Sequence, residues 1–278
     1  MTPEMILPIV FAVLVLLGLG IFCAVLLTLA SVFFSVKEDE KAVAIRECLP
    51  GANCGSCGYS GCDGYAAALS KGLTDKTNLC TPGGDGTAKD IAAILGVEAE
   101  DVVEMVAHVA CNGVCDHEDR KYDYHGPKSC RAANLFYEGD RACTYACLGY
   151  GDCIAVCPEH AIEISERGIA VVDQRKCIGC GLCVRTCPNG IISLLRDTHR
   201  VVVKCSNHDK GAVVRKFCLD GCIGCGKCEK NCPSDAIHVV DNLAVIDYKK
   251  CTSCGKCREV CPVHCIHEGN FTCGAHFK

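Results

Sequence analysis

The chain has 278 residues and a formal net charge of -5, and it contains 29 cysteines but no tryptophan. It has no basic cluster of the kind that marks nucleic-acid-binding proteins. A secreted disulfide scaffold does not fit either, because such chains are short, so the cysteines indicate reduced thiolates that hold small modules together by binding metal.

The chain begins with an apolar segment. Met5–Val36 contains no charged residue. This segment is longer than the roughly 20 residues that a helix needs to span a bilayer. A cleaved signal peptide would start with basic residues and have a shorter apolar run, whereas the early charge here is Glu4. Lys37 and Arg46 follow the segment, so residues 1–36 are predicted to be a single-pass anchor in the cell (inner) membrane, with the rest of the chain in the cytoplasm.

A glycine-rich group of cysteines lies in the next module, residues 37–110. Glycines beside each thiol let the backbone approach a metal cluster and leave N–H groups to bond its sulfurs. Cys48 competes for a ligand position, but it lies outside the glycine-rich loop. The predicted [4Fe-4S] ligands are Cys54, Cys57, Cys62 and Cys80.

Three helices are predicted in the same module, over Asp63–Leu73, Lys89–Leu95 and Glu98–Ala110. In the last of these, Met105 and His108 are expected to be ordinary packing or surface residues and not ligands.

The connecting segment 111–142 carries cysteines without regular spacing. They could hold a sixth cluster together with a residue from the later linker, or they could be buried free thiols. The candidates are Cys111, Cys115 and Cys130, with Cys205 or Cys218 as the fourth ligand.

The rest of the chain repeats the bacterial ferredoxin run C-x2-C-x2-C-x3-C-P, which gives three thiolates to one cubane and the fourth to its neighbour. Predicted hairpins separate the runs within each pair. Two ferredoxin-like units are therefore expected, at 143–195 and 218–278, joined by a linker at 196–217. Within that linker, 201–203 and 212–214 could pair as strands, and Lys210, Arg215 and Lys216 could steer an acidic partner.

The crossover rule predicts which cysteines share a cluster. In the second unit the sets are Cys222, Cys225, Cys228 and Cys261, and Cys251, Cys254, Cys257 and Cys232. In the first unit they are Cys177, Cys180, Cys183 and Cys157, and Cys143, Cys147, Cys153 and Cys187, where the spacing is looser. Five [4Fe-4S] clusters are expected in all, and six if the connecting segment holds one. Cys265 and Cys273 are assigned to no site.

Structural zinc is the alternative use of these cysteines, but zinc sites take two separated cysteine pairs and not triple runs. The sequence has no glycine-rich dinucleotide fingerprint and no Ser-His-Asp or HExxH constellation. The chain is therefore expected to carry electrons while bond-making chemistry occurs on another subunit.

An apolar span, the Cys54–Cys62 module and ferredoxin repeats together resemble the B-subunit family of the Rnf complex, the membrane-bound ferredoxin:NAD oxidoreductase that moves Na⁺ or H⁺. The resemblance covers essentially the whole chain, and its most specific part is the Cys54–Cys62 motif. Corrinoid iron–sulfur proteins have a related module but lack the anchor and the repeats. The two ferredoxin units make the chain similar to the longer form of the family.

The resemblance implies a translocase component without its own bond-making site. Soluble ferredoxin would be the electron donor, and membrane subunits with flavin and iron–sulfur centres would pass electrons to an NAD-reducing subunit. A membrane-anchored polyferredoxin of a hydrogenase or dehydrogenase is the alternative. The expected fold is α+β: one transmembrane helix, a small α-rich 4Fe-4S module and two tandem ferredoxin-like modules.

Overall fold

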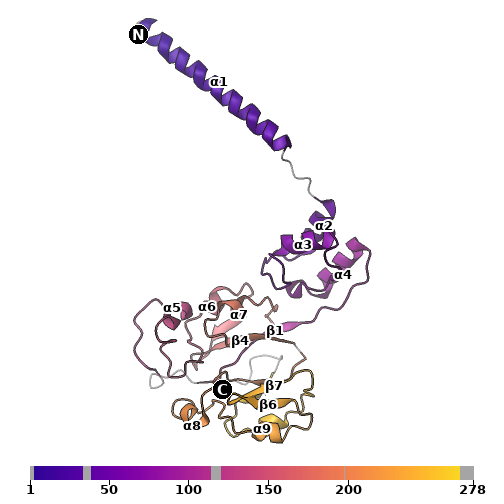
Figure 1. Cartoon of the computed structure of the whole chain (residues 1–278), viewed down its shortest axis with the longest axis vertical. Coiled ribbons are helices and arrows are strands. Elements are labelled where there is room, and N and C mark those ends of the chain that lie inside the picture. The colour runs from indigo at the N-terminus through magenta and orange to yellow at the C-terminus, as the bar shows by residue number, and fades with distance from the viewer. Residues whose placement is uncertain (1–2, 34–38, 114–119, 197, 270–278) are drawn as a thin grey trace.

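The computed structural model describes residues 3–33, 39–113, 120–196 and 198–269. Helices and short antiparallel strands alternate through these residues, so the fold is a mixture of helix and strand, as predicted. Figure 1 shows α1 standing apart at one end, a small helical module next to it, and the strand-bearing part of the chain at the other end.

Helix α1 (Pro3–Phe33) is the predicted apolar segment. Its stretch Val13–Ser31 has a mean hydropathy of 2.8 and is long and apolar enough to cross a membrane. None of that stretch is buried against the rest of the described chain, so its exposed apolar side chains need another apolar environment, which a bilayer provides. The helix is consistent with membrane anchoring.

The module after α1 is built from α2 (Glu40–Cys48), α3 (Cys62–Ser70), the 3-10 turn η1 (Thr81–Gly83) and α4 (Gly84–Leu95). Ile45, Tyr65 and Ile91 are fully buried between these helices. The Tyr65 hydroxyl donates a hydrogen bond to the carbonyl oxygen of Lys76 at 2.7 Å, which ties the loop before η1 to α3. Helix α4 ends at Gly96, where a φ of 70° is the left-handed conformation that favours glycine.

The first strand-bearing unit contains two antiparallel strand pairs, β1 with β4 and β2 with β3. Its elements are β1 (Met105–Val109), α5 (Cys130–Asn134), α6 (Asp152–Ala155), β2 (Ile162–Ile164), β3 (Ala170–Val172), α7 (Leu182–Thr186) and β4 (Ile192–Arg196). The predicted hairpin is confirmed, with Ile162 opposite Val172.

The predicted helix over 98–110 is wrong, because its second half is strand β1. Met105 lies opposite Arg196 and Val109 opposite Ile192. Val106 and Val109 are buried in this strand and are β-branched, which favours an extended backbone when a partner strand is present. The apolar spacing fits both a helix face and a strand, and β4 decides between them.

The second unit repeats this arrangement with β5 paired to β8 and β6 paired to β7. Its elements are β5 (Val201–Val203), α8 (Gly211–Val214), α9 (Lys227–Lys230), β6 (Ile237–Val240), β7 (Leu243–Ile246), α10 (Lys256–Glu259) and β8 (Ile266–Glu268). Asp241 and Asn242 both have positive φ between the paired Val240 and Leu243, the geometry of a tight two-residue hairpin turn. This hairpin is confirmed as well.

The expected pairing of 201–203 with 212–214 is wrong. Val201 lies opposite Glu268 at the far end of the second unit, and Gly211–Val214 forms helix α8. A strand that precedes each unit therefore pairs with the strand that ends it, β1 with β4 and β5 with β8.

Candidate iron–sulfur sites

Site 1 lies in the helical module. Cys57, Cys62 and Cys80 pack in one buried cluster with Tyr65. Burial, together with the charges of the neighbouring Cys62, Cys57 and Cys54, raises the pKa of the Cys80 thiol to about 11. The structure thus brings together the predicted set, Cys54, Cys57, Cys62 and Cys80.

Cys48 packs against the same buried cluster, but its thiol donates to the carbonyl oxygen of Ala44 in its own helix at 3.4 Å, and Cys48 is not among the cysteines whose charges act on Cys80. Burial raises the pKa of Cys48, followed by the charges of Asp90 and Glu47. Its position agrees with its lower rank among the candidate ligands.

Site 2 is a cavity in the first unit, between α7 and the end of the run that precedes β2. Backbone N–H groups point at its sulfurs: Ala107 donates to Cys177 at 3.4 Å and Ala161 to Cys157 at 3.3 Å. Strand β1 therefore contributes to this site as well as to the sheet. The cysteines that line the cavity are Cys157, Cys177, Cys180 and Cys183.

Site 3 differs from the predicted set at one position. Cys130, at the start of α5, lines its cavity where Cys143 was expected. Burial raises the pKa of Cys153 to about 12, and the charges of Cys147 and Cys130 are the next largest causes. The backbone N–H of Ala170 donates to Cys147 at 3.4 Å. The lining cysteines are Cys130, Cys147, Cys153 and Cys187.

Site 4 is the cavity that Cys143 lines instead, between the two units. Asn207 donates from Nδ2 to the Cys143 sulfur at 3.2 Å, a contact that no spacing pattern in the sequence indicates. Burial raises the pKa of Cys143, Cys205 and Cys218 to about 11 each. The lining cysteines are Cys111, Cys143, Cys205 and Cys218. Of the other candidates for a sixth cluster, Cys115 lies outside the described residues, as does the unassigned Cys273.

Sites 5 and 6 lie in the second unit and bring together the predicted sets. Cys222, Cys225, Cys228 and Cys261 line the cavity of site 5, together with Cys265. Cys232, Cys251, Cys254 and Cys257 line the cavity of site 6.

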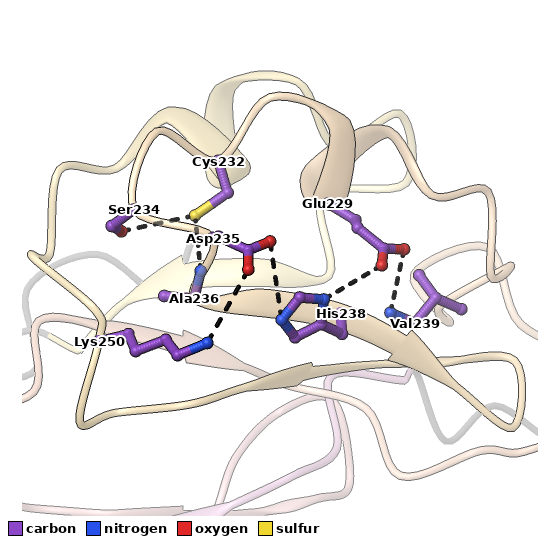
Figure 2. A network of polar contacts seen from close by, with 8 residues as sticks. All are labelled: Glu229, Cys232, Ser234, Asp235, Ala236, His238, Val239 and Lys250. Atoms are coloured by element: carbon purple, nitrogen blue, oxygen red, sulfur yellow. Dashed lines mark hydrogen bonds and ion pairs between the residues drawn. The ribbon is translucent and has the colours of Figure 1, made fainter.

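Figure 2 shows the polar surroundings of Cys232 in site 6. Although burial acts to raise the pKa of Cys232, hydrogen bonds from Ala236 and Ser234 hold it below its usual value. Beside it, His238 contacts Glu229 at 3.1 Å and Asp235 at 3.8 Å. These contacts fix the strand β6 against helix α9 and the loop after Cys232.

The donor chemistry of the sites fits a [4Fe-4S] cluster. Backbone N–H···S bonds of about 3.3 Å are made to Cys157, Cys205 and Cys232, and hydrogen bonds to the sulfurs are one way in which proteins tune such clusters. Buried thiols with raised pKa values are neutral alone but become thiolates when a cation coordinates them. Among the residues that the structure describes, no three His, Cys, Asp or Glu side chains converge as ligands of a single metal ion do.

Family models match this chain over the same cysteines. A model described as "Putative Fe-S cluster" covers residues 49–82. Models described as 4Fe-4S dicluster domains cover residues 142–192, 176–237 and 215–262. The chain is therefore an iron–sulfur protein of the electron-transfer class, with several 4Fe-4S domains and an apolar N-terminal helix.

Sequence similarity to curated proteins identifies the family of this chain. The chain is 44% identical over 243 residues to the B subunit of the Na(+)-translocating ferredoxin:NAD(+) oxidoreductase complex of Acetobacterium woodii, an alignment that covers 86% of this chain and 73% of that one. It is 41% identical to the B subunit of the proton-translocating complex of Clostridium ljungdahlii, covering 82% and 81%. It is also 41% identical to the B subunit of the ion-translocating oxidoreductase complex of Methanosarcina acetivorans, covering 85% and 89%.

The chain belongs to the B-subunit family of the Rnf complex, the electron-transfer subunits of ion-translocating ferredoxin:NAD oxidoreductases. Such a complex is an oxidoreductase and a translocase, and its other subunits are the partners of this chain.

Proposed function

We propose that this subunit accepts electrons from reduced ferredoxin at its second ferredoxin-like unit and delivers them to the membrane subunits through six [4Fe-4S] clusters, one at each of sites 1–6. A bound cluster supplies reversible one-electron transfer. The observation that carries the proposal is the series of six four-cysteine sites, each next to another along the molecule.

Direct contacts link site 1 to site 2. The Arg185 guanidinium on α7 donates to the carbonyl oxygen of Cys54, and Ser56 Oγ lies 3.5 Å from the carbonyl oxygen of Gly179. Burial raises the pKa of the Cys180 thiol, and nearby Cys54 raises it further. A ligand of site 1 is thus a near neighbour of a ligand of site 2.

Sites 2 to 4 follow one another through shared elements. Cys183 of site 2 is a charge neighbour of Cys153 of site 3. Ala146 lines the cavities of both site 3 and site 4, because Cys143 and Cys147 stand on either side of it and face different sites. This division accounts for the loose spacing of the first run.

One hydrogen bond joins site 4 to site 5, from the backbone N–H of Cys222 to the Cys205 sulfur at 3.3 Å. Sites 5 and 6 share both runs of the second unit, since Cys232 follows Cys228 and Cys261 follows Cys257. The proposed order is therefore site 6, 5, 4, 3, 2 and 1.

Site 6, at one end of the series, is placed to meet the electron donor, and site 1, at the other end, is placed near the membrane. In Figure 1 the elements α9, β6 and β7 lie at the end opposite α1. Cys254 of site 6 is exposed, and the exposed Lys249 and Lys256 flank it. Site 1 lies in the module that follows the apolar helix, where membrane subunits are within reach.

The proposed topology is a single pass with all six sites in the cytoplasm. Lys37 and Arg46 follow the apolar span, and basic residues near a span stay on the cytoplasmic side. The ion path is assigned to other subunits, because one span without a charged residue offers no polar route.

The test is anaerobic iron and sulfide analysis of the full chain with EPR of the reduced protein. Six clusters predict about 24 iron atoms per chain, at four per cluster. The Cys130→Ser/Cys153→Ser double variant should lose about four of these, since both residues line site 3. The Cys143→Ser/Cys153→Ser variant should lose about eight.

A loss of about four iron atoms from the Cys143→Ser/Cys153→Ser variant would return Cys143 to site 3 and remove site 4 from the series. A wild-type chain with zinc and little iron would overturn the proposal as a whole.

A further inference from the structure

The four ferredoxin runs differ at the residue four positions after the final cysteine. The first three runs have Ala161, Ile191 and Ala236 there, and the last has Cys265. The chain thus places a thiol at a position where its other runs place a hydrocarbon side chain.

Cys265 lies inside site 5 and not at its edge. It is 1% exposed, and it lines the cavity together with the site-5 ligands. Its sulfur lies 3.7 Å from the Cys261 sulfur, and Cys222 is its second hydrogen-bond partner. A thiol is both a weak donor and a weak acceptor, so its S–H can point toward either of these two ligands.

Site 5 already has four cysteine ligands without Cys265. A cubane takes four thiolates, and the ferredoxin rule assigns them to Cys222, Cys225, Cys228 and Cys261. The backbone N–H of residue 265 also bonds the Cys261 sulfur, as that of Ala236 bonds Cys232 at 3.3 Å. The backbone role is therefore common to the repeats, and the thiol is the additional feature.

We propose that Cys265 is a positioning residue of site 5, whose single S–H donates to the Cys261 sulfur or to the Cys222 sulfur and raises the reduction potential of the cluster there above the value that alanine would give. The inference rests on the proposed presence of a cluster at site 5. Reduction adds negative charge, so a hydrogen bond to a ligand sulfur stabilises the reduced form more than the oxidised form.

The thiol also distinguishes site 5 from site 6, which has Ala236 at the corresponding place. An electron that enters at site 6 would then move toward the more easily reduced neighbour. The net effect of one hydrogen bond corresponds to roughly a threefold to tenfold change in an equilibrium constant, or about 30–60 mV for a one-electron couple.

The experiment is an EPR-monitored redox titration of the anaerobic full-length chain. Cys265→Ala should lower the midpoint potential of one cluster by about 30–60 mV with iron and sulfide content unchanged. Cys265→Ser keeps a donor of similar size and should stay near the wild-type value. Ala236→Cys is the matched gain-of-function variant and should raise the potential of a different cluster.

A second pair of variants tests whether the change in midpoint potential belongs to the cluster at site 5. Cys228→Ser removes a ligand of that site, so the Cys228→Ser chain and the Cys228→Ser/Cys265→Ala chain should titrate alike. The proposal is overturned if Cys265→Ala leaves every potential unchanged, if Cys265→Ser titrates like Cys265→Ala, or if Cys265→Ala loses about four iron atoms, which would make Cys265 a ligand. Absence of iron from the wild-type site would instead contradict the proposed function.

Discussion

The Nε2 atom of His108 lies 3.1 Å from the carbonyl oxygen of Val203. His108 belongs to β1 in the sheet of the first unit, and Val203 to β5 in the sheet of the second, so this hydrogen bond joins the two units. A carbonyl only accepts, so the ring carries its proton on Nε2 and donates. Burial lowers the pKa of His108 to about 4, despite the opposing effect of the hydrogen bond to Val203.

The buried His108 predicts a loss of stability in mild acid. Below its unfolded pKa of about 6.5, the unfolded chain binds a proton that the folded chain binds only near pH 4, so stability falls as the pH drops through this window. At pH 5.5 the loss should be on the order of 1 kcal/mol relative to pH 7.5. Thermal unfolding of wild type and His108→Gln at both pH values measures it.

The glutamine variant keeps a donor but does not titrate, so its loss between the two pH values should be smaller by the same amount. Acid damage to the clusters affects both proteins and cancels in the comparison. Equal pH dependence of the two proteins would show that His108 is not responsible.

Arg185 is predicted to maintain electron transfer between sites 1 and 2. Its side chain donates to Cys54 across the boundary between the helical module and the first unit, so Arg185→Ala should loosen this boundary and slow the last step severalfold without loss of iron. Stopped-flow reduction of the anaerobic chain measures the step. Arg175→Ala is the control, since Arg175 is also exposed on the first unit. Equal rates in both variants would contradict the prediction.

Charge reversal should locate the ferredoxin contact. Lys249→Glu/Lys256→Glu places negative charge beside Cys254 of site 6 and should slow reduction by reduced ferredoxin about tenfold at low ionic strength, with a weaker effect at high salt. Lys210→Glu/Arg215→Glu/Lys216→Glu changes the exposed basic residues beside site 4. A larger effect from this second variant would move the entry point to the linker.

A side chain at Gly179 is predicted to destabilise the protein. The φ of this glycine is 65°, and an added Cβ would press on the backbone oxygen of Met105 and lie 3.0 Å from Thr81 Cγ2. Gly226→Ala is the matched control, because its φ is 69° but nothing lies within 4 Å of an added Cβ. Gly179→Ala should cost about 1–3 kcal/mol more than the control, measured by thermal loss of the visible iron–sulfur absorbance.

The features that are predicted most accurately from the sequence are those formed by residues close together in the chain. The runs of cysteines, the hairpins and the apolar helix are each encoded within about 30 residues, and the hairpins and helix are present where expected. Strand β1 is not predicted as a strand because it needs a partner, and its partner β4 lies more than 80 residues away. The apolar spacing of Val106 and Val109 alone cannot separate helix from strand.

The assignment of Cys130 to site 3 and Cys143 to site 4 is not predicted from the sequence either, because it also depends on contacts with distant residues. Cys143 stands in the first run, and the spacing rule groups it there, but Asn207 and Cys205 from beyond the first unit approach it in space. The irregular spacing between Cys143 and Cys153 is the available signal. It marks a segment that serves two cavities, and the cavity that a given thiol faces depends on contacts that no spacing rule records.

The pairing of β1 with β4 and of β5 with β8 has a practical consequence for fragments of this chain. A recombinant piece that starts at Cys143 or Cys222, where the cysteine runs of the two units begin, would leave β4 or β8 without its neighbouring strand and expose an unpaired edge. Fragments intended for expression or crystallisation should start before Met105 or before Val201, so that each piece carries both halves of its own sheet.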